Sequence, residues 1–267
     1  MKKHTIKLIT LLLIPSFLSA CNNNEKTIVI GATPSPHAEI LNSKVIKDCI
    51  ESQGYHLKVQ IYQDYVTPNK ALDDEGIDAN YFQHLPYLTK ELEKGYQIGA
   101  ACQVHNEPLN LYSANKVNDF SNKTISIVND ASNVERAYKL LLANNIIDSY
   151  SVDNFNAQHP EYTSAIGVKI ECLDPGLLNI KVNEGGLAVI PGNYALTAWG
   201  SKKASEYVLF GESLDVAYPN IIAVKNKNLN SIKTDIIVKA LSQPSLKTFI
   251  EDTYGPTVNY CFLDLRK

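Results

Sequence analysis

Four side chains with rings stand close together in the sequence, and together they could form an apolar slot with polar tips. Phe82 and His84 are two residues apart in an extended segment, so they share a face. Pro86 suits the first turn of a helix, which places Tyr87 near the end of that segment. Tyr65 can join them from the preceding loop. Such a slot would hold a thioether, which gains about 0.3–1.5 kcal/mol per aromatic contact; the competing interpretation is that the rings belong to the core.

A second group of candidate residues follows the apolar run that ends at Val128. Asn129 comes directly after that run, and Ser132 and Glu135 have the spacing of a capping box, which predicts a helix starting at Ser132. Arg136 then lies one turn into the helix. Free N–H groups at a helix start and a guanidinium can together hold a carboxylate. The alternative is a surface arginine paired with a local acid.

Alternating strands and helices must position the ring cluster. Continuous apolar runs predict buried strands, and apolar residues at helical spacing predict amphipathic helices. The expected order is a strand over 27–31, a helix over 37–53, a strand over 56–62, a helix over 67–74, an extended segment over 78–84 and a helix over 88–93. This alternation is typical of a wound α/β layer.

The rest of the chain predicts a second α/β unit. The expected elements are extended segments over 98–104 and 109–113, strands over 124–128, 168–173, 187–190 and 220–224, and helices over 133–147, 193–199, 232–241 and 246–254. We expect the chain to cross between the units near residues 115 and 222. One lobe would then comprise 27–114 with 223–267, and the other 115–222. Open α/β sheets bind ligands at the carboxyl ends of their strands, so the cleft between them is the expected site.

The N-terminus has the features of a secretory signal peptide, expected over residues 1–20. A basic start precedes a mostly apolar stretch over 9–18, which is shorter than the roughly 20 residues that span a bilayer. Residues 18–21 read Leu-Ser-Ala-Cys and match the bacterial lipobox, in which the cysteine carries the lipid. We therefore expect lipidation of Cys21 and a polar tether over 21–26.

Charge and cysteine content narrow the function classes. Losing the signal peptide would lower Lys and Arg from 25 to 22 against 28 acidic residues, a net charge of about −6. There is no long basic run, so no nucleic-acid partner is expected. The other cysteines are widely spaced, which leaves both disulfides and buried free thiols open. They are Cys49, Cys102, Cys172 and Cys261.

Enzymes and metal carriers are the competing classes. The sequence contains no nucleophile elbow, phosphate loop, kinase signature or zinc motif, so neither catalysis nor a cofactor is expected. The histidines show no metal-ligand spacing such as H-x3-H, so no metal is expected either. They include His37, His56, His84, His105 and His159. A calorimetric zinc titration would decide the metal question.

The sequence as a whole resembles the NlpA family of methionine-binding lipoproteins, which serve ABC importers. The resemblance rests on residues 31–34 and 36–41, and more specifically on 64–69 and 78–87, together with the lipobox. It extends from about residue 27 to the C-terminus. It implies an α/β, two-lobed, periplasmic-binding-protein-like (type II) fold with a hinged cleft between the lobes.

The resemblance also implies which residues contact the ligand. Those matching the tail-binding positions are Tyr65, Phe82, His84 and Tyr87. Those matching the positions at the amino-acid end are Asn129 and Arg136, and Asn220 matches a further ligand contact. The sequence departs from the family pattern at Pro191, where the family often has asparagine, and Asn193 is the candidate substitute. Residues 129–132 read Asn-Asp-Ala-Ser in place of Asn-Asp-Pro-Thr.

The implied function is that of a lipid-anchored substrate-binding protein of an ABC importer. It would be a monomer on the cell membrane, facing the periplasm or the outside, and would deliver methionine to the permease and its ATPase. The alternatives are a binder of another small amino acid or of a methionine-containing dipeptide, or a surface antigen that keeps the fold without transport. Ligand stereochemistry, disulfide state and choice of inner or outer membrane stay open.

Overall fold

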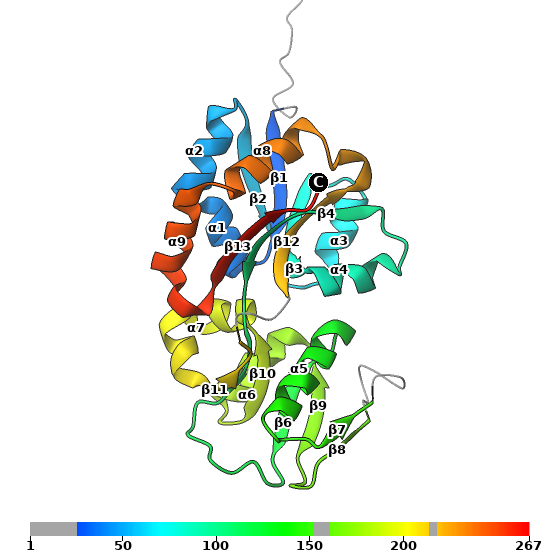
Figure 1. Cartoon of the computed structure of the whole chain (residues 1–267), viewed down its shortest axis with the longest axis vertical. Helices are drawn as coiled ribbons and strands as arrows, with labels where there is room; N and C mark the ends of the chain where they lie inside the picture. The colour runs from blue at the N-terminus through cyan, green and yellow to red at the C-terminus, as the bar shows by residue number, and fades with distance from the viewer. Residues whose placement is uncertain (1–25, 152–160, 214–217, 267) are drawn as a thin grey trace, which may run out of the picture.

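Apolar strands form the centre of two lobes in the computed structural model, which describes residues 26–151, 161–213 and 218–266 (Figure 1). In spatial order, the sheet of the first lobe contains β13 (Asn259–Asp264), β4 (Ile98–Asn106), β12 (Pro219–Lys225), β3 (Ala79–His84), β1 (Thr27–Ala32) and β2 (His56–Ile61). β1 pairs in parallel with β2 and β3, whereas β12 is antiparallel to β3 and β4. The expected βαβ alternation is therefore present.

Helices cover both faces of this sheet (Figure 1). On one face the helices are α1 (Glu39–Asn42), α2 (Lys44–Ser52), α8 (Ile232–Leu241) and α9 (Pro244–Tyr254). Their apolar side chains, such as Ile46 and Ile250, join one buried cluster with Ile28. On the other face, α3 (Thr67–Asp73) and α4 (Leu85–Leu92) contribute Leu72 and Leu88 to a second buried cluster. The start of α4 and the end of β3 are thereby fixed at the edge that faces the other lobe.

The single helix expected over 37–53 is divided in the structure. A short helical turn, η1 (Pro34–Ala38), leads into α1, and Ser43 separates α1 from α2 with extended backbone (φ −58°, ψ 150°). The Ser43 hydroxyl accepts a hydrogen bond from the Ile46 N–H, so it caps α2. The apolar spacing continues across this break, which is why the pattern alone predicts one helix.

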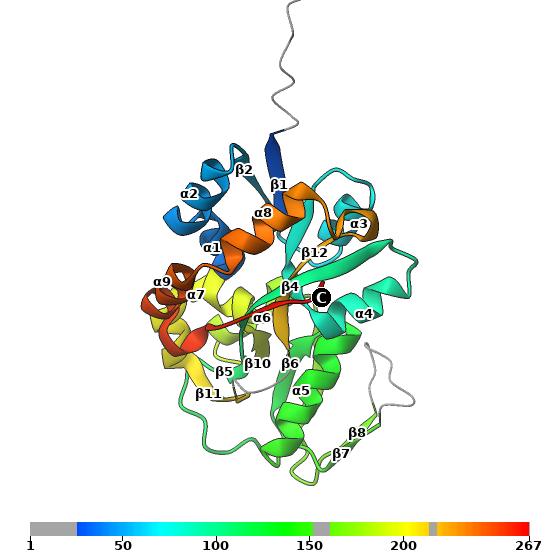
Figure 2. The same ribbon diagram turned by 45° about the horizontal axis from the view of Figure 1, so that its top comes forward.

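The second lobe contains a sheet with the order β11 (Val208–Gly211), β5 (Leu109–Tyr112), β10 (Leu187–Pro191), β6 (Thr124–Val128) and β9 (Lys169–Leu173). β6 is parallel to β9 and β10, whereas β5 is antiparallel to β10 and β11. A small two-stranded sheet, β7 (Ser149–Tyr150) with β8 (Tyr162–Thr163), lies at the far end of this lobe from the first (Figure 2).

Three helices complete the part of the second lobe that the structure describes. α5 (Ala131–Ala143) packs on one face of the sheet, with Val134 and Tyr138 in the core. α6 (Pro175–Asn183) and α7 (Gly192–Tyr207) pack on the other face. α7 is interrupted at Gly200, whose φ of +68° lies in the left-handed region that favours glycine. The helix expected over 193–199 is the part of α7 before this interruption.

The chain passes between the two sheets at residues 107–108 and again between β11 and β12. The first passage is earlier than the expected boundary near 115, because β5 pairs with β10 in the second lobe. The second is also earlier than 222, because β12 begins at Pro219 in the first sheet. The polar composition near residue 115 marks a loop within the second lobe. The lobes also touch directly, through α4 with α5 and α7 with η1.

The α/β two-lobed fold expected from the sequence is confirmed. The predicted signal peptide, the tether up to residue 25 and Cys21 lie outside the described residues. Within the described ranges, no helix is both long and apolar enough to span a bilayer. Cys49, Cys102, Cys172 and Cys261 are present as free thiols.

Candidate ligand-binding site between the lobes

A narrow cavity of about 20 Å³ lies where the two lobes meet. It is lined by side chains from both sheets and from the segment that connects them. Seven of the eight residues predicted to contact a ligand line this cavity: Tyr65, Phe82, His84, Tyr87, Arg136, Asn193 and Asn220. Gln83, Glu107, Asn133, Pro191 and Gly192 complete its wall.

The predicted ring cluster is present in the wall of the cavity. The ring centroids of Tyr65 and Phe82 are 5.8 Å apart, those of Tyr65 and Tyr87 5.7 Å, and those of Phe82 and Tyr87 6.0 Å. Phe82 points from the end of β3, and Tyr87 stands in the first turn of α4, as the alternation and Pro86 predict. The rings are tilted or edge-on to one another, which leaves ring edges and faces available to an apolar chain.

His84 connects the ring cluster to the second lobe. Its Nδ1 accepts a hydrogen bond from the Tyr87 N–H and caps α4, so its Nε2 carries the proton and donates to Asn133 Oδ1 at 3.0 Å. Burial, and then the positive charge of Arg136, lowers the pKa of His84 to about 3. The imidazole is therefore neutral at pH 7, and its role is to position the rings and α5.

Asn193 is the second connection between the lobes. Tyr65 donates its hydroxyl hydrogen to Asn193 Oδ1 at 2.6 Å. Burial raises the pKa of Tyr65 well above its ordinary value, so the hydroxyl stays a donor. Pro191, at the N-cap of α7, provides no side-chain cap. The Asn193 N–H instead donates to the carboxylate of Glu107, which lies outside the helix.

The start of α5 differs from the prediction in two respects. The cap is Asp130, whose Oδ1 accepts from the Asn133 N–H at 3.0 Å, and not Ser132. Asn129 is exposed and donates to Asp174 at 2.9 Å, so it lies outside the cavity. Because the helix starts earlier than predicted, Asn133 is the amide that reaches the cavity. A cap assigned by capping-box spacing alone misses the competing aspartate.

Arg136 also lines the cavity and is 4% exposed. Its Nε donates to both carboxylate oxygens of Glu212, at 2.7 and 2.8 Å, and its Nη2 donates to one of them at 2.5 Å. Nη2 also donates to the backbone carbonyl of Glu107 at 2.8 Å. The ring of Tyr218 stacks on the guanidinium, with its centroid 4.4 Å from Cζ. Nη1 has no hydrogen-bond partner among the described residues.

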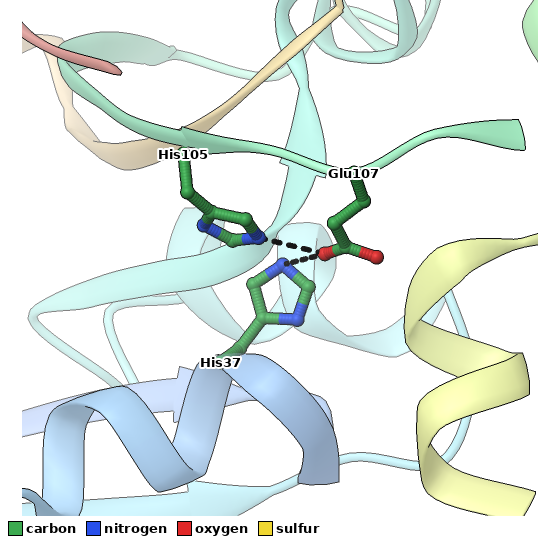
Figure 3. Close-up of side chains that lie close together, drawn as sticks. All are labelled: His37, His105 and Glu107. Carbon is green, nitrogen blue, oxygen red and sulfur yellow. Dashed lines mark hydrogen bonds and ion pairs between the residues drawn. The ribbon is translucent and has the colours of Figure 1, made fainter. Parts of the chain in front are cut away.

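Glu107 is the charged residue of the cavity that sequence reasoning missed. Figure 3 shows His37 and His105 directing their Nε2 atoms at one oxygen of its carboxylate, at 3.4 and 2.8 Å. The second oxygen points toward α7. These three residues offer ligand atoms within 4.8 Å of one another, so they are the described group that could hold a metal ion. Sequence spacing could not reveal them, because His37 and His105 are far apart in the chain.

Hydrogen bonds within the protein already occupy the nitrogen atoms of both imidazoles. His37 Nδ1 accepts from the Thr33 hydroxyl at 2.8 Å, and its Nε2 also lies 3.0 Å from Asn220 Oδ1. His105 Nδ1 accepts from the Tyr81 hydroxyl. Burial lowers the pKa of His37 to about 4 and that of His105 to about 3, so both are neutral at pH 7.

Comparison with known proteins gives consistent results. The model of the NlpA lipoprotein family matches residues 28–260. Methionine-binding lipoprotein MetQ of Bacillus subtilis is 30% identical over 277 residues, covering 93% of this chain and 95% of its own length. A nutrient-binding protein of Burkholderia cenocepacia, solved with bound methionine, is 30% identical with a TM-score of 0.78, covering 88% of this chain and 100% of its own. A periplasmic substrate-binding protein of a Coxiella burnetii ABC transporter is 29% identical, with the same TM-score and coverage.

Proposed function

The chain belongs to the NlpA lipoprotein family, and on this premise we propose that it is a lipid-anchored substrate-binding protein that carries methionine for an ABC importer. Membership of this family makes it a binding protein and not an enzyme. The relatives described above are named for methionine binding or for ABC transport. The ligand and the delivery step for this chain are the parts that we propose.

The observation that supports this proposal best is the composition of the cavity. The wall combines a cluster of aromatic rings with a buried guanidinium. A thioether packs well against ring edges, and a guanidinium matches a carboxylate. Methionine has these two groups at opposite ends of one short chain, so a single molecule can use both.

Each predicted contact residue that lines the cavity has a role in this proposal. Phe82, Tyr65 and Tyr87 enclose the thioether tail, while His84 orients Tyr87 and Asn133. Arg136 receives the α-carboxylate through the Nη1 side of its guanidinium, since Glu212 takes the Nε side. Three side-chain amides in the cavity wall add hydrogen-bond donors to the ligand's polar end: Asn133, Asn193 and Asn220.

Delivery would depend on the relative movement of the two lobes. Ligand contacts from both lobes favour the arrangement in which the lobes touch, and a permease would recognise it. In our proposal a lipid on Cys21 holds the monomer at the membrane surface, with the ATPase on the opposite side of the permease. In this proposal the lobes rotate about the passage at 107–108.

Titration calorimetry of the purified protein tests the ligand directly. We expect one methionine per chain with an affinity in the micromolar range or tighter, and a weaker response to leucine, which lacks the thioether. Mass spectrometry of the small molecules released on denaturation provides an independent test. Binding of a methionine-containing dipeptide or another amino acid in preference to methionine would contradict the proposed ligand, and binding of none would contradict the proposed function.

A further inference from the structure

A second cavity lies beside the passage that joins the two lobes. It has a volume of about 380 Å³, which suits a small organic molecule. Its second-lobe wall comes from β5, α7 and β11, and its first-lobe wall from η3 (Gly255–Thr257), which follows α9. α7 packs directly on η3, next to the end of α9 (Figure 1). Because both lobes contribute to this hinge cavity, its shape depends on the angle between them.

The hinge cavity is separate from the candidate ligand-binding cavity. Of the described residues, Gly192 alone lines both cavities. Arg136 lines the ligand-binding cavity and Glu212 lines the hinge cavity, so the ion pair between these two side chains stands at the boundary. The hinge cavity therefore offers room for a second molecule while the ligand-binding cavity is occupied.

Apolar side chains form most of the hinge-cavity wall. Leu196 and Ala204 come from α7 and are buried. Pro108, Val208 and Pro256 add apolar surface from the passage, from β11 and from η3. A molecule that fills this space removes its own apolar surface and that of the wall from water. The wall therefore favours a mainly apolar ligand.

Asn110 provides a free hydrogen-bond acceptor in this apolar wall. The residue is 8% exposed, and its Nδ2 donates to the hydroxyl oxygen of Tyr112 at 3.0 Å. Its Oδ1 accepts no hydrogen bond from the described residues. A Cβ atom on Gly211 would overlap this oxygen, so the glycine leaves room for it. A ligand that donates a hydrogen bond here gains an interaction that a purely apolar ligand lacks.

The charge next to the hinge cavity disfavours anions. The carboxylate of Glu212 pairs with Arg136 and accepts from the Leu109 N–H at 2.9 Å. No lysine or arginine is among the described residues of the wall. An anionic ligand would place a like charge near Glu212 without a cation of the wall to compensate for it.

We propose that the hinge cavity is a second binding site, for a small uncharged and mainly apolar molecule that carries one N–H or O–H donor. A molecule in it contacts η3 of the first lobe and α7 of the second, and so favours the arrangement in which the lobes touch. Methionine favours the same arrangement in the proposed function. The two ligands should therefore strengthen each other's binding, since such coupling is reciprocal. Only this coupling depends on the proposed function.

Indole and benzofuran are suitable probes, because they have nearly the same shape and only indole has an N–H donor. Ligand-observed NMR measures their binding to the protein with and without saturating methionine. We expect indole to bind with a Kd of about 1 mM or lower, also when methionine is present, and benzofuran to bind about fivefold more weakly. Indole-3-carboxylate, an anion, should bind more weakly than indole. Calorimetry should show at least about a twofold gain in methionine affinity with saturating indole.

Two variants locate the probe. Ser205 is exposed at the cavity wall, and a phenylalanine there would fill the space, so Ser205→Phe should lose indole binding. Ser242→Phe is the matched control, because both hydroxyls donate to the carbonyl three residues earlier in an exposed position and Ser242 lies outside the cavity. Asn110→Leu keeps a similar shape without the acceptor, so it should remove the preference for indole over benzofuran.

The outcomes separate the site from the coupling. Absence of indole binding at about 5 mM, well above the expected Kd, would overturn the proposed site, as would equal indole binding by the wild type and a folded Ser205→Phe variant. Equal affinities for indole and benzofuran would overturn the role of Asn110. Methionine affinity that does not change with indole would overturn the coupling. If the protein binds no methionine, the proposed function fails, whereas loss of indole binding in Ser205→Phe still supports the hinge site.

Discussion

A Cβ atom on Gly192 would lie 2.8 Å from the Cβ of Glu107 and 2.8 Å from its Oε2. Gly192 is the first residue of α7, so its missing side chain allows the helix and the Glu107 carboxylate to approach each other. The close approach of Glu107 therefore requires a residue without a side chain at position 192.

This relationship predicts that Gly192→Ala displaces Glu107 or the start of α7. We expect about 1–3 kcal/mol lower unfolding free energy, as for other overpacked sites, and weaker methionine binding. Urea unfolding and calorimetry measure the two effects. Gly176→Ala is the matched control, because a Cβ there would have no neighbour within 4 Å; equal behaviour of both variants would contradict the prediction.

Arg136→Ala should remove the partner of the ligand carboxylate and weaken methionine binding by about 2–5 kcal/mol, the range for truncating a buried, hydrogen-bonded charge. Arg136→Lys keeps the positive charge but lacks the planar guanidinium, so its affinity for methionine should lie between those of the wild type and Arg136→Ala. Arg266→Ala is the control, since Arg266 pairs with Asp264 and Asp235 away from the cavity. Normal methionine binding by the folded alanine variant would show that the carboxylate is held elsewhere.

Tyr65→Phe should weaken methionine binding by about 1 kcal/mol, roughly fivefold. The ring remains, but the hydrogen bond to Asn193 Oδ1 that joins the lobes is lost. We expect small-angle X-ray scattering to show a larger radius of gyration for the variant at equal ligand concentration. Tyr55→Phe, which is outside the cavity wall, provides the comparison. A Tyr65→Phe variant with unchanged affinity and dimensions would exclude this role.

Three buried histidines in the described part of the chain predict a loss of stability in mild acid. Burial lowers the pKa of His37 to about 4, and those of His84 and His105 to about 3, whereas an unfolded histidine titrates near 6.5. Below about pH 6.5 the unfolded chain binds more protons than the folded one, so the unfolding free energy falls as the pH falls toward 4. Glu107, whose pKa is raised by burial, opposes this trend.

Urea unfolding at pH 7 and pH 5 measures the effect. We expect a loss of about 1–2 kcal/mol per buried imidazole between these values. His84→Gln should reduce the difference, while exposed His56→Gln leaves the three buried rings in place and should not. Equal stability of the wild type at both pH values would contradict the prediction.

Periodicity predicted most of the fold because apolar spacing reflects burial directly. β1, β3, β6, β10 and their following helices lie where the sequence places them, within a few residues. α6 begins at Pro175, and its outward-facing Leu177 and Ile180 obscure the helical pattern, so it was not predicted. β11 and β13 were also missed. Each is an edge strand whose extended conformation depends on pairing with its neighbour, β5 or β4.

The cavity likewise contains residues placed by local sequence and residues placed by long-range pairing. Phe82, His84 and Tyr87 are near neighbours in sequence, and strand alternation with a helix start is enough to bring them together. Glu107 and Glu212 depend on where the chain passes between the lobes, which long-range strand pairing decides. Asn129 was predicted to reach the cavity, but Asn133 lines it in the structure, because the Asp130 cap moves the first turn of α5. Residues placed by local rules were therefore predictable, and those placed by topology were not.

The rings and the charged groups of the cavity come from separate parts of the chain. The rings come from residues 65–87, whereas the charged groups stand on the passage at Glu107, on α5 and just after β11. Mutations within residues 65–87 can therefore change which ligand side chain binds, without altering the binding of the ligand's α-carboxylate by Arg136. Specificity for the ligand side chain can change during evolution while recognition of the α-carboxylate is retained. A designed biosensor could use the same separation.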